Sequence, residues 1–196
     1  MKRIFGQSFE VCFVVFCAFA VCLIGTTPGF AQASSAMAAP AGPIKDPVST
    51  SLRFMLSGRA KNTLGAIDAM PADKFSYKPT PDQMSFAHLV IHITESNNGL
   101  CAKVADVPAP KVDELKETDS KDKLLAAAKA SFDFCTNALS KMDDSKLGDS
   151  IELFGRQGPR ALAALILVSG SADHYADAAM YLRLNGILPP SAQPKK

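Results

Sequence analysis

Three histidines are the residues of this chain whose type and spacing best suit chemistry. His88 and His92 lie four positions apart, and His174 lies far along the chain. On a helix, residues four apart occupy neighbouring turns of one face, and three imidazoles are a complete protein ligand set for a catalytic zinc ion that keeps a position open for water. The alternative is that His88 is exposed and that the other two are boundary residues bonded to neighbours, because a bare His-x3-His pair is common.

Helical periodicity surrounds these histidines. Apolar residues recur every three or four positions in four segments, which predicts helices over residues 46–70, 85–104, 120–142 and 159–184. Asp46 followed by Pro47 is a typical helix start, and Gly186 followed by two prolines is a typical stop. Neither β-type alternation nor an internal repeat is present, so the expected fold class is all-α, an antiparallel four-helix bundle.

The same periodicity indicates which side chains face the core. His92 lies at the edge of the apolar stripe of the second predicted helix, and His88 lies further round, towards solvent.

Residues 147–159 connect the third and fourth helices. The GRQGP run within them (155–159) has no preceding strand and no following Lys-Ser or Lys-Thr, so it is interpreted as a plain turn and not as a phosphate-binding loop.

The first residues are typical of a secretory signal peptide. Lys2 and Arg3 precede an apolar run over 11–24, and small residues at 29 and 31 suit cleavage before Gln32. The alternative is an uncleaved membrane anchor, but the run is shorter than the roughly 20 residues that a membrane span needs. The predicted location is therefore the periplasm or the exterior, with no stable membrane insertion after cleavage.

The predicted organisation is a single domain with short flanking segments. A signal peptide (1–31) and a flexible leader (32–45) precede the bundle (46–190), and a disordered tail follows (191–196). Without residues 1–31, Lys plus Arg falls from 21 to 19 and Asp plus Glu from 19 to 18. This balance leaves no basic field for nucleic acid, which is excluded as a partner.

Several short motifs, in this order, resemble the DinB/YfiT-like four-helix-bundle superfamily of proposed metalloenzymes, and especially its secreted branch. They are MPADKF (70–75) with KPTP (78–81), SFAHLVIHI (85–93) with Asn97 and Cys101, SFDFC (131–135), LFGR (153–156) and HYADAAMYLRLNGILPP (174–190). Together they span nearly all of the chain after the signal peptide, and the last is the most specific.

The resemblance implies a divalent-metal site and shows where this chain departs from it. The family usually holds Zn, Ni, Mn or Fe with one His on the second helix, which matches His92, and a His-x3-His pair on the fourth, whose second member matches His174. The first member falls on Gly170. Asp177 or His88 could supply the third ligand; otherwise the site is lost.

The resemblance also pairs two cysteines. Cys101 and Cys135 match the family's cysteines on the second and third helices, and an exported protein meets an oxidising compartment, so a disulfide is expected. The alternative is two buried, reduced thiols.

Two functions follow from the resemblance and from its gap at Gly170. One is a metal-dependent hydrolase or thiol transferase; the other is a non-catalytic, disulfide-stapled binding or structural bundle. The sequence names neither a substrate nor a small-molecule ligand. The apolarity of the fourth helix is compatible with a central position in the bundle or with a homodimer interface.

Overall fold

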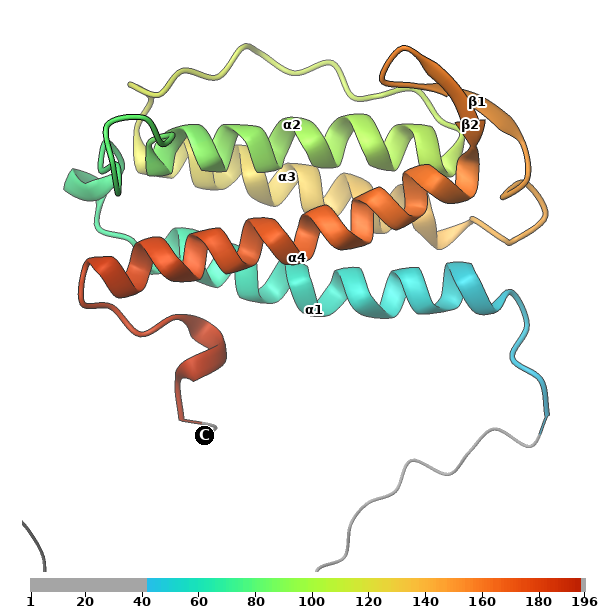
Figure 1. Ribbon diagram of the computed structural model, residues 1–196, viewed down its shortest axis with the longest axis horizontal. Coiled ribbons are helices and arrows are strands. Elements are labelled where there is room, and N and C mark those ends of the chain that lie inside the picture. Colours follow the sequence, from blue (N-terminus) through green and yellow to red (C-terminus); the bar gives the residue numbers. More distant parts are fainter. Residues whose placement is uncertain (1–41, 195–196) are drawn as a thin grey trace, which may run out of the picture. The chain divides into compact units, whose positions relative to one another are not determined.

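Four long helices make up the body of the protein (Figure 1). The computed structural model describes residues 42–194, so the predicted signal peptide (1–31) and most of the predicted leader lie outside the described residues. The helices are α1 (Pro47–Ala69), α2 (Phe86–Ala105), α3 (Lys121–Ser140) and α4 (Arg160–Leu184). The predicted all-α four-helix bundle is confirmed, with helix ends within two residues of the expected positions. Within residues 42–194, no helix combines the length and apolarity that crossing a membrane requires.

Side-chain pairs between helices define how the chain runs through the bundle. Asn97 bonds Ser131 and Cys101 bonds Cys135, two pairs with the same sequence separation of 34, so α2 and α3 run in the same direction. The expected antiparallel arrangement is therefore wrong for this pair of helices, because the connection between them is long enough to return along the bundle. The end of α2 is connected to the start of α3 by a long crossover, residues 106–120, which runs back along the length of the bundle (Figure 1). α2 is antiparallel to α4, because Arg160 at the start of α4 donates to the Lys103 carbonyl near the end of α2.

Two apolar clusters, one towards each end of the bundle, form the core. One contains Met70, Phe86 and Tyr181, and the other contains Leu52, Leu139 and Leu167. The connection between α1 and α2, which includes the short helix η1 (Ala72–Lys74), is held to the first cluster by aromatic contacts. Phe75 packs edge-to-face on Phe86 with ring centroids 5.2 Å apart.

The connection between α3 and α4 contains a β-hairpin that the sequence analysis interpreted as a plain turn. Strands β1 (Ser150–Leu153) and β2 (Arg156–Pro159) pair antiparallel. The two turn residues, Phe154 and Gly155, both have positive φ, 52° and 77°, as the tight hairpin turn with two central residues requires. Asn-Gly is the usual sequence there, and a non-glycine residue in this region costs about 1 kcal/mol. The GRQGP run therefore builds β2 and no phosphate loop.

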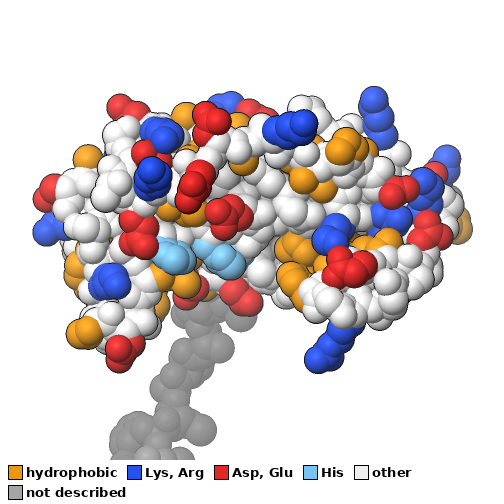
Figure 2. Space-filling model, turned by 90° about the horizontal axis from the view of Figure 1, so that it is seen from above, with side chains coloured by type: hydrophobic (Ala, Val, Ile, Leu, Met, Phe, Trp, Pro, Cys, Tyr) orange, Lys and Arg blue, Asp and Glu red, His pale blue; other side chains and the backbone are white. Residues whose placement is uncertain are grey.

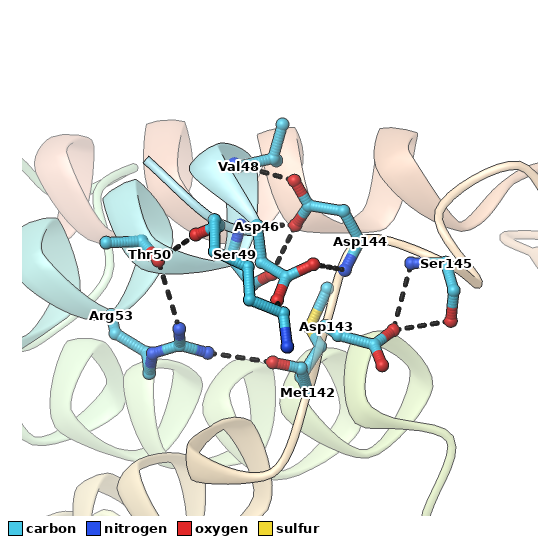
Figure 3. A network of polar contacts seen from close by, with 10 residues as sticks. Asp46, Val48, Ser49, Thr50, Arg53, Met142, Asp143, Asp144 and Ser145 are labelled. Carbon is cyan, nitrogen blue, oxygen red and sulfur yellow. Dashed lines mark hydrogen bonds and ion pairs between the residues drawn. The ribbon is translucent and has the colours of Figure 1, made fainter. Parts of the chain in front are cut away.

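The start of α1 is capped by a residue distant in sequence. Asp46, the predicted cap, has φ 48° and makes no side-chain cap bond. Instead, the Asp144 carboxylate accepts hydrogen bonds from the backbone N–H groups of Val48 (2.9 Å) and Ser49 (2.8 Å) and from the Ser49 hydroxyl (Figure 3). Arg53 donates in return to the Met142 carbonyl beyond the end of α3 (2.9 Å). The two helix ends therefore satisfy each other's free backbone groups.

Asp144→Asn is expected to lower the melting temperature by several degrees near neutral pH. Burial raises the pKa of Asp144, but hydrogen bonds from Ser49 and Val48 and the nearby Arg53 charge outweigh it, so the net pKa lies below 3.8. Because the folded-state pKa is below the unfolded value, the ionised carboxylate stabilises the fold above about pH 4, and this stabilisation is lost as pH falls further. Thermal melts at neutral pH and at about pH 3 should show the difference between wild type and variant shrinking in acid.

The control for this measurement is Asp133→Asn, which changes an exposed carboxylate that pairs only with Lys129 on the same helix. A surface pair of this kind contributes little, so its melting temperature should stay close to that of the wild type. Equal losses from the two substitutions would contradict the capping role of Asp144.

The C-terminal segment remains in contact with the bundle beyond residue 190, where the sequence analysis placed the end of the bundle. Residues from 191 onward were expected to form a disordered tail, but the turn η2 (Pro190–Ala192) lies at the bundle surface. The Tyr175 hydroxyl donates to Ser191 Oγ (2.6 Å) and accepts from the Ser191 N–H (2.9 Å). A Cβ added at Gly65 would lie 3.0 Å from Pro190 Cγ, so α1 approaches this turn closely because residue 65 is glycine. The chain is thus held through residue 191.

Candidate metal centre

His92 and His174 meet between α2 and α4. Their ring centroids lie 4.9 Å apart, with the rings at 82° to one another. His92 is exposed and His174 is half-buried, so the pair sits at the bundle surface and not in its centre. Figure 2 shows neighbouring histidine side chains at the surface, with acidic side chains around them. The structure therefore brings together His92 and His174, the two predicted metal ligands, which are far apart in sequence.

The surroundings of His174 favour its neutral form. Burial lowers its pKa below the ordinary 6.5, and the neighbouring His92 lowers it further, while Asp177 and Asp173 act in the opposite direction. A neutral imidazole keeps one nitrogen lone pair free, which is the form that binds a metal or accepts a hydrogen bond. His174 is therefore ready to act as a ligand near neutral pH.

Gly170 occupies the position where the third ligand would be needed. It precedes His174 by one turn of α4, and a Cβ built on it would lie 3.9 Å from His174 Cε1, with no other contact within 4 Å among the described residues outside its own stretch of helix. The direction of its missing side chain is therefore towards His174, and there is room for a side chain. Glycine offers no donor atom there.

Among the described residues, neither proposed replacement completes a three-ligand cluster with the pair. His88 Nδ1 lies 2.9 Å from Glu117 Oε1 in the crossover, and hydrogen bonds first from Ser85 and then from His88 lower the pKa of Glu117. Asp177 lines a cleft with Met84 and Tyr181. Across the part of the chain that the structure describes, no three His, Cys, Asp or Glu side chains converge to hold a metal ion. The residues present do not fit a three-ligand centre.

Comparison with known proteins assigns the fold to a family. A family model described as the DinB superfamily matches residues 55–176, which is more than half of the chain. The chain belongs to the DinB superfamily.

Solved structures support this assignment at the level of the fold. A DinB-like protein from Bacillus cereus ATCC 10987 is similar with a TM-score of 0.60 and 16% identity, over 72% of this chain and 95% of that one. The DinB-like protein YjoA from Bacillus subtilis matches with a TM-score of 0.60 and 20% identity, over 74% and 99% of the two chains. A search of curated protein sequences found no match. At such identities, the structural likeness concerns the fold alone.

This DinB-superfamily bundle contains the expected disulfide. Cys101 on α2 and Cys135 on α3 are bonded, with Cα atoms 5.2 Å apart, and both are buried. Their sulfurs are therefore not available as thiolate ligands or nucleophiles while the bond is intact.

Buried polar residues next to the disulfide are the part of the DinB-superfamily bundle that sequence reasoning missed. Asn97 Nδ2 donates to Ser131 Oγ (3.0 Å) inside the bundle, and the neighbouring Asn98 is also buried. Two consecutive asparagines within an apolar-striped helix were the available signal, because such residues are unusual in a core. The partner of Asn97 lies on another helix and could not be read from the local pattern.

Proposed function

We propose that this chain is an exported DinB-superfamily bundle whose metal centre has been reduced to the His92–His174 pair, and that it acts by binding a partner molecule and not by metal-dependent catalysis. The observation that carries the proposal is Gly170, whose missing side chain points towards His174. Export is supported by the signal-like first residues and by the Cys101–Cys135 disulfide, since such bonds persist in oxidising compartments.

The coordination chemistry of zinc supports this reading. Catalytic zinc centres use three protein ligands and leave one position to water or substrate. Two imidazoles supply only part of that set, and even changes to outer-shell partners cost a centre about 10–100-fold in affinity or activity. A two-histidine pair is therefore expected to bind divalent ions weakly and reversibly.

The second candidate function is a metal-dependent hydrolase or thiol transferase that uses Zn, Ni, Mn or Fe. It is favoured by the closeness of His92 to His174, with ring centroids 4.9 Å apart, and by the lowered pKa of His174. This candidate requires a third ligand from outside the pair, supplied by substrate or by another molecule.

Metal analysis of the purified protein without a histidine tag separates the two candidates. After loading with Zn, Ni, Mn or Fe in turn and desalting, we expect well under one equivalent of retained metal. Elemental analysis provides the measurement, with isothermal titration for the weak binding that remains. His174→Ala should abolish that weak binding, because it removes the half-buried imidazole of the pair.

The matched control is His88→Ala, because His88 pairs with Glu117 and not with the other histidines. It should leave the weak binding unchanged. If the wild type retains one equivalent of metal tightly and His174→Ala loses it, the result would favour the metalloenzyme and contradict the binding proposal. Equal loss from both variants would show instead that α2 supplies two ligands.

A further inference from the structure

A cavity of about 240 Å³ lies away from the histidine pair, between α2, α3 and the crossover. Its walls are mainly apolar, with Leu115 from the crossover and Ala127 and Phe134 from α3. The crossover wall is anchored at Glu117, whose carboxylate accepts from Ser85 Oγ (2.5 Å) at the start of α2. The cavity is thus bounded by two helices and a tethered segment.

Asn98 is the polar group of this cavity that lacks a partner. Its side chain is only 8% exposed, and its Oδ1 is buried without a hydrogen-bond partner among residues 42–194. Folded proteins satisfy nearly all such atoms, because an unmet buried acceptor opposes folding. A residue that lines the cavity therefore has an unmet acceptor just beneath its wall.

The neighbouring hydroxyl groups in the cavity do not donate to Asn98. Thr94 Oγ1 donates to the Val90 carbonyl (2.8 Å), and Ser131 Oγ donates to the Ala128 carbonyl (2.7 Å). A hydroxyl has one proton to donate, so both donors are already used within their own helices. Neither hydroxyl has a proton left for Asn98, so its donor has to come from beyond these described neighbours, as a water or a bound molecule.

We propose that this cavity binds a small, mainly apolar, neutral molecule that carries one N–H or O–H group, and that this group donates to Asn98 Oδ1. Rotation of the carboxamide about its soft χ2 torsion turns the oxygen towards the cavity. Lys123 and Asp113 both line the cavity and carry opposite charges, which does not favour an ionic ligand. The inference rests on the proposed binding function and names its site.

A matched pair of probes tests the role of Asn98. Indole has an N–H donor, and 1-methylindole has nearly the same shape without one. We expect indole to bind the purified protein with up to about tenfold higher affinity than 1-methylindole, since that is the factor a single hydrogen bond contributes at most in a typical case. Protein-observed NMR titration provides both dissociation constants. In Asn98→Leu the two affinities should become equal.

Two further variants make the result interpretable. Asn137→Leu makes the same change at an exposed position of α3 and should keep the preference for indole. Ala127→Leu fills the cavity and should weaken both probes. Equal affinities in the wild type, or no binding of either probe, would overturn the proposal and leave an ordered water as the partner of Asn98. Those outcomes would not alter the metal measurement, so failure of this site and failure of the proposed function remain distinguishable.

Discussion

Gly170→His is expected to turn the histidine pair into a centre that retains one equivalent of zinc. The substitution places a third imidazole one turn before His174, at a position whose Cβ lies 3.9 Å from His174 Cε1, an ordinary van der Waals separation. Three imidazoles complete the ligand set of a zinc site, so zinc affinity should rise at least about 100-fold over the wild type. Competition titration with a chromophoric chelator provides the two dissociation constants.

Three variants control this result. Gly58→His adds the same side chain on α1, where a Cβ meets nothing within 4 Å, and should not raise the affinity. Gly170→Ala removes the glycine without adding a ligand. Gly170→His combined with His174→Ala should lose the gained affinity, because the rebuilt centre depends on both residues of α4. A Gly170→His protein no better than Gly58→His would show that the two helices do not present their imidazoles to one ion.

Removal of the disulfide is expected to cost about 3–4 kcal/mol of unfolding free energy. Cys101 and Cys135 close a loop with a sequence separation of 34, and the chain-entropy model assigns about that stabilisation to a loop of this length. The loop includes the whole crossover between α2 and α3. For a domain of this size the loss corresponds to roughly 10 °C in melting temperature.

Urea unfolding of the wild type with and without reductant measures this effect without changing the sequence. Peptide mapping after alkylation should find Cys101 and Cys135 linked in the unreduced protein and free after reduction in denaturant. A matched substitution, both cysteines to alanine, should be at least as unstable as the reduced protein because it also removes buried sulfur. Free Cys101 and Cys135 thiols in the unreduced, denatured protein would disprove the bond.

Features that depend on neighbours in sequence could be predicted from the sequence. The four helices were predicted, because their apolar residues repeat at the helical period, and two of the predicted segments begin at the residue that caps the helix in the structure. Ser85 and Ser120 accept hydrogen bonds from the backbone N–H groups of His88 (3.0 Å) and Lys123 (3.3 Å). Such bonds span three residues, so their signal lies in one short motif.

Features that join distant residues were missed or misplaced. The cap of α1 was assigned to Asp46 on local grounds, but Asp144 performs it, and the two segments are nearly a hundred residues apart. The hairpin was missed because its strands have four residues each and its turn is Phe154-Gly155 in place of the usual Asn-Gly. In both places tertiary packing outweighed local preference.

The sequence by itself determined the helices, because apolar residues one helical turn apart share a face, and its motifs indicated the family. The same resemblance placed Gly170 where the family has a histidine. The sequence could not determine that His92 and His174 meet, or that His88 contacts Glu117 instead. Nor could it determine that Asn98 lines a cavity and that its Oδ1 has no hydrogen-bond partner among residues 42–194. Those outcomes depend on how α2 and α4 cross and on where the crossover lies. Periodicity specifies a residue's face on its own helix, and only the packing of helices specifies what that face meets.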